Sequence, residues 1–209
     1  MPISTEFGAV PESNPHAFST INLLVDSYVR LAERAADEEA AAARDPLTGL
    51  FTRSALEAAY QTLQQTKSSQ RTIDRLMGEN SLLFADVDKF KELNDTQGHT
   101  AGDEALSAIG GVLLGRTRDE DTPARWGGDE FIVLLPRTAK EQASKLARDI
   151  VRKVAATDIA TLSIGVAPVD LDQSLANNIE RADLAMYRAK QSGGNTVVRW
   201  HESLSPINS

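Results

Sequence analysis

Two acidic residues follow a short apolar run near the middle of the chain. The run at 81–87 leads into Asp86-Val-Asp88, and because alternate side chains of a strand share one face, Asp86 and Asp88 point the same way. Two such carboxylates repel each other unless a cation lies between them, and Mg²⁺ is typically held by one or two carboxylates together with substrate phosphates. The pair therefore indicates a metal site. The alternative is that Asp88 caps the next helix and that Asp86 lies at a solvated strand end.

A second acidic pair follows two glycines. The segment 127–130 reads Gly-Gly-Asp-Glu and leads into the apolar run at 131–135. A hairpin turn accounts for the glycines, because they allow a sharp turn and the close approach of a ligand. A turn does not account for the acids. If this hairpin lies beside the strand that ends at Asp86, then Asp129 and Asp86 can share a metal, as phosphoryl transfer requires.

Alternating apolar and amphipathic stretches predict the elements that position these acids. Their order favours an α/β or α+β sandwich in which helices cover a central sheet. The stretch at 66–80 is polar and is predicted to be part helix and part loop. Strands are expected at 81–87, 122–126, 130–135, 159–166 and 196–200. Helices are expected at 52–65, 89–94, 102–114, 139–155 and 175–191.

The N-terminal part has a different pattern. Residues 1–16 contain three prolines and few large apolar groups, which predicts a disordered lead-in. Residues 17–43 carry apolar residues every three to four positions, which predicts a helix of roughly 40 Å with a heptad-like seam. Such a helix either lies on the globular part or pairs with a second copy and relays a signal. The globular domain is expected at 44–203, followed by a tail at 204–209.

Composition narrows the function. The 209 residues carry a net charge of -8 and no cysteine, which excludes disulfides, thiolate zinc sites and cysteine nucleophiles. An acidic surface disfavours binding of a nucleic-acid polymer. The longest fully apolar run, at 131–135, is too short for a membrane span, and the N-terminus lacks the pattern of a signal peptide. We expect a soluble cytoplasmic protein that acts on a small molecule through a metal.

Several further motifs accompany the acids in a fixed order. Besides Gly-Gly-Asp-Glu-Phe at 127–131, the chain contains Asp-Pro-Leu-Thr-Gly-Leu at 45–50 and Asp-Val-Asp-Lys-Phe-Lys-Glu-Leu-Asn-Asp at 86–95. Gly98-His99, Gly102-Asp103, Ser163-Ile-Gly165 and a set of matches between 182 and 195 complete the series. Together they resemble the GGDEF domain, the diguanylate cyclase family, over about residues 44–200.

The resemblance implies a fold and an activity. The fold would be a palm-like nucleotidyl-cyclase fold with a central, mostly antiparallel five-stranded sheet, preceded by the long N-terminal helix. The activity would be the condensation of two GTP molecules into cyclic di-GMP and two pyrophosphates, with Mg²⁺ or Mn²⁺ as cofactor. Each domain of the family binds one GTP, so two domains must face each other as a homodimer.

The resemblance also implies catalytic roles. Asp86 and Asp129 would ligate the metal together with the backbone carbonyl of Val87. Glu130 would help to deprotonate the attacking 3′-hydroxyl or stabilise the transition state. Asp88 would support the site rather than bind guanine.

Substrate-binding roles follow in the same way. Asn94 and Asp103 would bind the guanine edge, and a carboxylate at 103 fits because it accepts from both N1–H and the N2 amine, which adenine does not offer. The phosphates would be bound by a set of cationic and backbone groups at Lys89, Phe90, Lys91 and Lys190. The alternative is that the lysines are surface residues and that Asn94 and Asp103 are helix caps.

A second nucleotide site is suggested at 118–121, which has the form Arg-x-x-Asp of the family's product-inhibition site. Arg118 would offer a fork to guanine O6 and N7, and Asp121 would accept from N1 and N2. Short matches of this kind also arise by chance in acidic loops. The family's secondary arginine has no clear match: its position resembles Asp149, with Arg148 beside it, so altered inhibition is expected.

One departure from the family pattern concerns the phosphates. Many members carry a phosphate-binding arginine at the position of Gly194. A catalytically weak domain that senses cyclic di-GMP or GTP is therefore the alternative to an active cyclase. A cyclase that makes a mixed dinucleotide is a third hypothesis, against which Asp103 argues.

Overall fold

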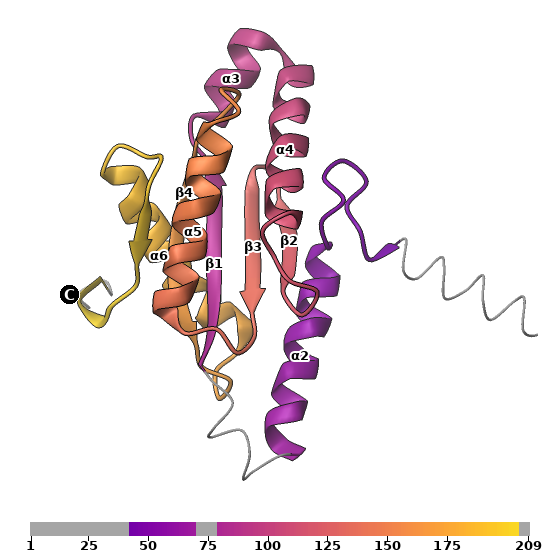
Figure 1. Cartoon of the computed structure of the whole chain (residues 1–209), viewed down its shortest axis with the longest axis vertical. Helices are drawn as coiled ribbons and strands as arrows, with labels where there is room; N and C mark the ends of the chain where they lie inside the picture. Colours follow the sequence, from indigo (N-terminus) through magenta and orange to yellow (C-terminus); the bar gives the residue numbers. More distant parts are fainter. Residues whose placement is uncertain (1–41, 70–78, 205–209) are drawn as a thin grey trace, which may run out of the picture. The chain divides into compact units, whose positions relative to one another are not determined.

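A computed structural model of the chain describes residues 42–69 and 79–204 (Figure 1). The chain divides into units at 1–42 and 43–209. The expected lead-in and the expected helix up to residue 41 lie outside the described residues, as do residues 70–78 and 205–209. The description below concerns the second unit.

Five strands form one sheet with β1 at its centre. β1 pairs antiparallel with both β3 and β4, β2 pairs antiparallel with β3, and β5 adds in parallel to β4. The predicted mostly antiparallel, five-stranded sheet is therefore confirmed. The strands are β1 (Asn80–Val87), β2 (Thr122–Gly127), β3 (Glu130–Leu135), β4 (Leu162–Val169) and β5 (Val197–Arg199).

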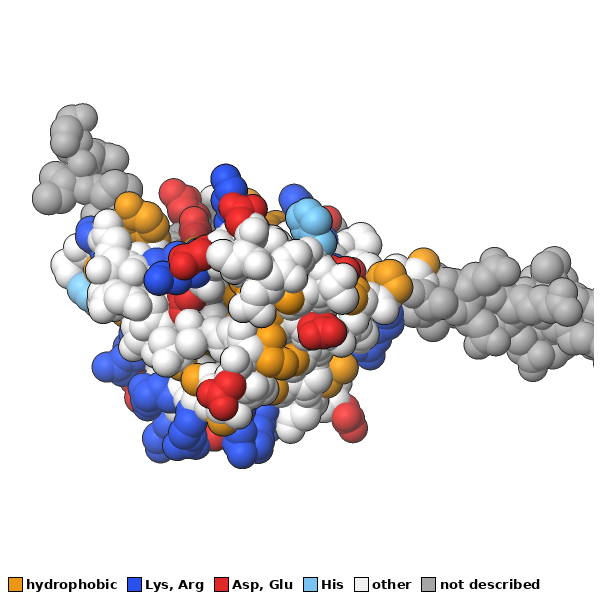
Figure 2. Space-filling model, turned by 90° about the horizontal axis from the view of Figure 1, so that it is seen from above, with side chains coloured by type: hydrophobic (Ala, Val, Ile, Leu, Met, Phe, Trp, Pro, Cys, Tyr) orange, Lys and Arg blue, Asp and Glu red, His pale blue; other side chains and the backbone are white. Residues whose placement is uncertain are grey.

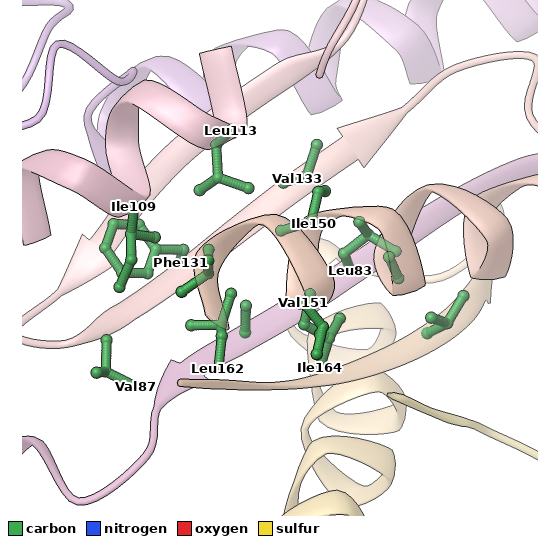
Figure 3. Packing of buried hydrophobic residues seen from close by; sticks show 14 of the residues in the cluster. Leu83, Val87, Ile109, Leu113, Phe131, Val133, Ile150, Val151, Leu162 and Ile164 are labelled. Atoms are coloured by element: carbon green, nitrogen blue, oxygen red, sulfur yellow. The ribbon is translucent and has the colours of Figure 1, made fainter. Parts of the chain in front are cut away.

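Helices cover both faces of the sheet. Leu113 of α4 and Ile150 of α5 pack with Leu83 and Phe131 on one face (Figure 3). Leu56 of α2 packs with a second cluster on the other face, where α6 also lies. The alternation of side chains along β1 supplies both clusters, which explains why this strand is buried almost throughout. The helices are α2 (Arg53–Ser69), α3 (Phe90–Gln97), α4 (His99–Leu114), α5 (Lys140–Ala155) and α6 (Leu175–Gln191).

Several boundaries differ from the prediction: α2 ends at Ser69 rather than at 65, α3 at Gln97 rather than at 94, and β4 at Val169 rather than at 166. The starts of α4 and β4 have clear physical reasons. α4 begins at His99 rather than at 102, and Gly102 lies inside its first turns. Its lack of a side chain is required there, because a Cβ would meet Oδ1 of Asn94 at 2.0 Å. β4 begins at Leu162 rather than at 159, because the chain first turns back at the end of α5, and this turn leaves Ile159 exposed.

No helix in the described ranges is long and apolar enough to cross a membrane.

Candidate active site at the end of the central strand

The end of β1 and the β2–β3 hairpin lie side by side. Asp86 is directly opposite Glu130 in the antiparallel register, and the N–H of Val87 donates to the carbonyl of Asp129 at 3.2 Å. Gly128, with a φ of 52°, allows the tight turn between the two strands of the hairpin. The structure therefore brings together three of the four acids that the sequence singled out, Asp86, Asp129 and Glu130, at the end of the sheet where α3 begins.

One lysine contacts this acidic group. Nζ of Lys190, in the last turn of α6, forms an ion pair with Oδ1 of Asp86. Burial raises the pKa of Asp86, and the charges of Asp129 and Asp88 raise this pKa further, whereas Lys190 lowers it. Figure 2 looks onto the end of the molecule at which α3 lies, where acidic and basic side chains are neighbours on the surface.

Glu130 lies in the same electrostatic environment. Burial raises its pKa, the nearby carboxylates of Asp86, Asp129 and Asp183 add to this effect, and Lys190 opposes it. Asp183 on α6, to which the sequence assigned no role, is thus a neighbour of this acidic group. Its distance from Lys190 is seven residues, which places both side chains on one face of α6. This seven-residue spacing is the signal by which the sequence could have indicated that Asp183 lies near Lys190.

Asp88, two residues beyond Asp86, has very different surroundings. Its carboxylate accepts hydrogen bonds from the hydroxyls of Thr161 (2.7 Å) and Ser163 (2.6 Å) and from the backbone N–H of Asn195 (2.7 Å). It thereby ties the end of β1 to β4 and to the turn that follows α6. This arrangement agrees with a supporting role.

The position expected to carry an arginine is part of the same turn. Gly194 has a φ of 74°, and a Cβ there would come within 2.9 Å of the Asp88 carboxylate. The turn and the carboxylate therefore fit together only because residue 194 has no side chain.

The α3–α4 arm carries the residues expected to bind nucleotide. Lys89 has a left-handed backbone (φ 54°), and no side chain caps the N-terminus of α3 that follows it. Free backbone N–H groups at a helix N-terminus favour phosphate binding. Phe90 packs partly against the core and so anchors this end of α3, whereas Lys91 is exposed.

The two residues expected at guanine also lie on this arm. Asn94 is partly buried against Gly102, and its Oδ1 has no hydrogen-bond partner among the described residues. Asp103, the neighbour of Gly102, is exposed. Neither side chain caps a helix in this structure, because α4 begins at His99 and has no side-chain cap.

Comparison with known proteins identifies the family of this chain. The family model described as "Diguanylate cyclase, GGDEF domain" matches residues 42–196. The chain belongs to the GGDEF domain family.

Named relatives agree with this assignment. Diguanylate cyclase DgcM of Escherichia coli is 39% identical over 165 residues, which are 77% of this chain and 39% of DgcM. Diguanylate cyclase A of Treponema denticola is 42% identical over 126 residues, which are 56% of this chain and 34% of the relative. The chain thus spans well under half the length of these relatives.

A solved structure agrees as well. The coiled coil and GGDEF domain of DgcB from Caulobacter crescentus, in complex with c-di-GMP, has a TM-score of 0.77 and 25% sequence identity. The similarity covers 88% of this chain and 98% of that one.

The hairpin of this GGDEF domain is braced from outside by one arginine. Nε and Nη2 of Arg125 donate to the carbonyl of Gly128 (3.1 and 2.9 Å), and Nη1 contacts the Asp45 carboxylate at 3.3 Å. Burial raises the pKa of Asp45, but hydrogen bonds from Thr48 and the charge of Arg125 outweigh it, so this pKa lies below its ordinary value. The sequence contains the motifs at 45–50 and 127–131 but no local signal that Asp45 and Arg125 are in contact.

The expected inhibition site of this GGDEF domain forms a closed turn. The carboxylate of Asp121 accepts from the backbone N–H of Arg118 at 2.8 Å, and the Asp121 side chain is buried. Burial raises the pKa of Asp121. Arg118 is exposed and pairs loosely with Glu120 at 3.8 Å. In this conformation the arginine is presented to solvent and the aspartate stabilises the turn that presents it.

The position of the missing secondary arginine is also occupied by ion pairs. Asp149 pairs with Arg116 at 3.3 Å and contacts Arg152 as well. The hydrogen bond from Arg152 and the two arginine charges lower the pKa of Asp149. Asp149 therefore holds two surface arginines, Arg116 and Arg152.

The donor set at the end of β1 fits a hard divalent cation. In the described parts of the chain, no group of three or more His, Cys, Asp or Glu side chains is arranged to hold a metal ion. Asp86 and Asp129, which the strand register sets beside each other, supply the one or two carboxylates that Mg²⁺ takes when water and substrate phosphates complete its shell. An ammonium group already lies on the Asp86 carboxylate, so the position favours a cation.

Proposed function

We propose that this chain is the catalytic part of a diguanylate cyclase, with the cyclase domain at 44–203. It would condense two GTP molecules into cyclic di-GMP and two pyrophosphates. The observation that carries the proposal is the register of β1 and β3, which sets Asp86 opposite Glu130 and beside Asp129, next to Lys190. The relatives named diguanylate cyclase support it.

In this proposal, Asp86, Asp129 and the carbonyl of Val87 would hold Mg²⁺ or Mn²⁺. When bound, the metal would supply charge neutralisation for the triphosphate and polarisation of the reacting phosphorus. Glu130 accepts the proton of the attacking 3′-hydroxyl, and its raised pKa suits a general base better than that of an exposed glutamate does.

The remaining site residues bind and orient GTP. Lys91, Lys190 and the uncapped N-terminus of α3 at Lys89 and Phe90 bind the phosphates. Asn94 and Asp103 bind guanine from the α3–α4 arm. Asn94 contributes an oxygen without a present partner, and Asp103 contributes an exposed carboxylate.

Two copies are required, since each domain holds one GTP and the product joins two. We propose a homodimer with facing sites, brought together by the helix expected at 17–43. Pairing would raise the local concentration of one site near the other. The similar DgcB structure includes a coiled coil, which supports this arrangement.

Product inhibition is proposed at the 118–121 turn, with Arg118 binding guanine of cyclic di-GMP. The DgcB structure is a complex with c-di-GMP, which supports a product-binding site in this fold. The ion pairs of Asp149 leave the secondary cation of the family absent, so we expect weaker inhibition than in a domain that has both.

The direct test is incubation of the protein with GTP and Mg²⁺ or Mn²⁺, with cyclic di-GMP and pyrophosphate as readouts. We expect two pyrophosphates per cyclic di-GMP and a rate that rises with the square of protein concentration below the dimer dissociation constant.

One feature, Gly194, favours the second candidate, a binding module. Binding of GTP without turnover at concentrations that dimerise the chain would establish that alternative.

A further inference from the structure

The contact between Lys190 and Asp86 joins an accessible cation to an inaccessible carboxylate. The Lys190 side chain is 36% exposed, whereas the Asp86 side chain is 12% exposed. Asp86 is therefore largely shielded from water, and the lysine lies directly on its Oδ1 atom. A second cation at this carboxylate would lie next to the ammonium group and compete with it for the same negative charge.

The acids at this position need a cation even without a ligand. Asp86, Asp129 and Glu130 are brought together by the strand register, and like charges at close range in a partly buried site destabilise one another. Within the described residues, Lys190 is the one Lys or Arg within ion-pair distance of any of the three. The lysine thus supplies the compensation that a metal would otherwise provide.

We propose that Lys190 is an exchangeable internal cation, which occupies Asp86 in the free protein and is displaced by the metal–nucleotide complex. This inference rests on the proposed function, because it takes Asp86 as a metal ligand. Mg²⁺ lies at about 2.0–2.1 Å from a ligating oxygen, so a metal on the Asp86 carboxylate would lie close to an ammonium group on that carboxylate, and the two cations would repel each other. The metal and the lysine therefore compete for Asp86.

The surroundings allow the lysine to move while its helix stays in place. The turn that follows α6 is tied to β1 by the hydrogen bond from Asn195 N–H to Asp88, so the end of the helix is fixed. The lysine stem has four rotatable carbons and an ammonium group with three donors, which can be redirected without backbone change. A triphosphate placed at Asp86 offers the displaced ammonium new acceptors.

Two consequences follow by thermodynamic linkage. Metal without nucleotide must displace the lysine from Asp86 and supplies no new acceptor in exchange, so it binds weakly. Metal together with nucleotide supplies phosphates for the displaced lysine, so the two ligands bind cooperatively. The exchange keeps the acids compensated in the free protein and reserves metal binding for the metal–nucleotide complex.

The experiment is a Mn²⁺ titration of the full chain without nucleotide, with free Mn²⁺ followed by electron paramagnetic resonance. The variants are Lys190→Met and the control Arg188→Met, which removes one positive charge from an exposed position in the last turn of the same helix, where the arginine donates a hydrogen bond to Gln191. We expect Lys190→Met to bind Mn²⁺ about tenfold more tightly than wild type, a change equivalent to one pKa unit of interaction. Arg188→Met should match wild type.

A second arm locates the effect and separates it from the proposed function. Asp86→Asn in the Lys190→Met background should abolish the gain, and a nonhydrolysable GTP analogue should tighten Mn²⁺ binding in wild type more than in Lys190→Met. Unchanged or weaker Mn²⁺ binding by Lys190→Met, or an equal gain in Arg188→Met, would overturn the exchange. If wild type still makes cyclic di-GMP in that case, the proposed function stands while the exchange falls. Absence of Mn²⁺ binding with and without the analogue in every variant would sink both.

Discussion

Asp86 and Asp88 lie two residues apart at the end of the same strand, and their carboxylates have opposite surroundings. Asp88 accepts three hydrogen bonds from β4 and from the turn after α6, all supplied by the protein itself. Asp86 has one lysine, and it faces further acids across the hairpin. The difference shows that one carboxylate completes the fold, and it supports the proposal that the other binds a ligand.

The same contrast is found on the other side of the hairpin. Asp45 accepts hydrogen bonds from Thr48 and lies against Arg125, and its pKa is lowered. Glu130 is surrounded by acids, and its pKa is raised by burial and by those charges. Perturbed carboxylates that gather without internal partners are typical of functional sites. Carboxylates with hydrogen-bond or ion-pair partners stabilise the folded state, whereas carboxylates that lie close to one another destabilise it.

The largest effect is expected when a gathered acid is neutralised. Asp129→Asn should lower cyclic di-GMP formation by about 10³-fold, since it removes a metal ligand worth several kcal/mol in the transition state. Its free energy of unfolding should stay equal or rise slightly, because a repelling charge is removed. Product formation and urea denaturation measure the two quantities.

Glu141→Gln, an exposed acid on α5, is the control for turnover and should leave it unchanged. A loss of stability in Asp129→Asn comparable to its loss of activity would contradict the comparison, since Asp129 would then be a structural group.

The next largest effect concerns the partnered acid of the same strand. Asp88→Ala should lower the free energy of unfolding by about 2–4 kcal/mol, because hydrogen bonds to a charged acceptor contribute about 1.5–3 kcal/mol and their donors lose their partner. The exposed Asp119→Ala should change it by less than about 0.5 kcal/mol. Chemical denaturation measures both, and equal stability of the two variants would break the distinction between Asp86 and Asp88.

Much of this arrangement could be predicted from the sequence. The positions of the strands along the chain, both acidic pairs and the hairpin follow from short apolar runs and from Gly-Gly at 127–128, since these signals are local. α6 was predicted with both of its ends correct, because its amphipathic pattern is long and Ser174 caps it. What could not be predicted is which distant groups satisfy each acid. The partners of Asp88 are 73 and 75 residues away for the two hydroxyls and 107 for Asn195, and no local pattern specifies such pairs.

The brace at Asp45 should have a smaller effect that depends on pH. Asp45→Asn should cost about 1–3 kcal/mol of unfolding free energy at neutral pH, since it weakens the Thr48 and Arg125 contacts. The folded pKa lies below the unfolded one, so the contribution of the carboxylate is complete above the ordinary aspartate pKa of about 3.9 and is lost as the pH falls through the folded pKa. Wild type and variant should therefore converge in acid. A constant difference across this range would show that the charge of Asp45 is not what stabilises the turn.

The smallest effect on stability is expected at Arg118, whose turn combines an exposed guanidinium with the buried, hydrogen-bonded carboxylate of Asp121. Arg118→Ala keeps the backbone N–H that Asp121 binds and removes only an exposed guanidinium, so unfolding should change by less than about 0.5 kcal/mol. The same variant should raise the cyclic di-GMP concentration needed for half-inhibition about tenfold, since a bidentate arginine–guanine contact contributes about 1–3 kcal/mol.

Asp121→Asn is the matched comparison: it weakens the buried hydrogen bond that closes the turn and should lower stability more than Arg118→Ala does. Progress curves with added cyclic di-GMP and urea titrations separate the two variants, and inhibition that is unchanged in Arg118→Ala would exclude this turn as the product site while leaving the fold-completing role of Asp121 intact.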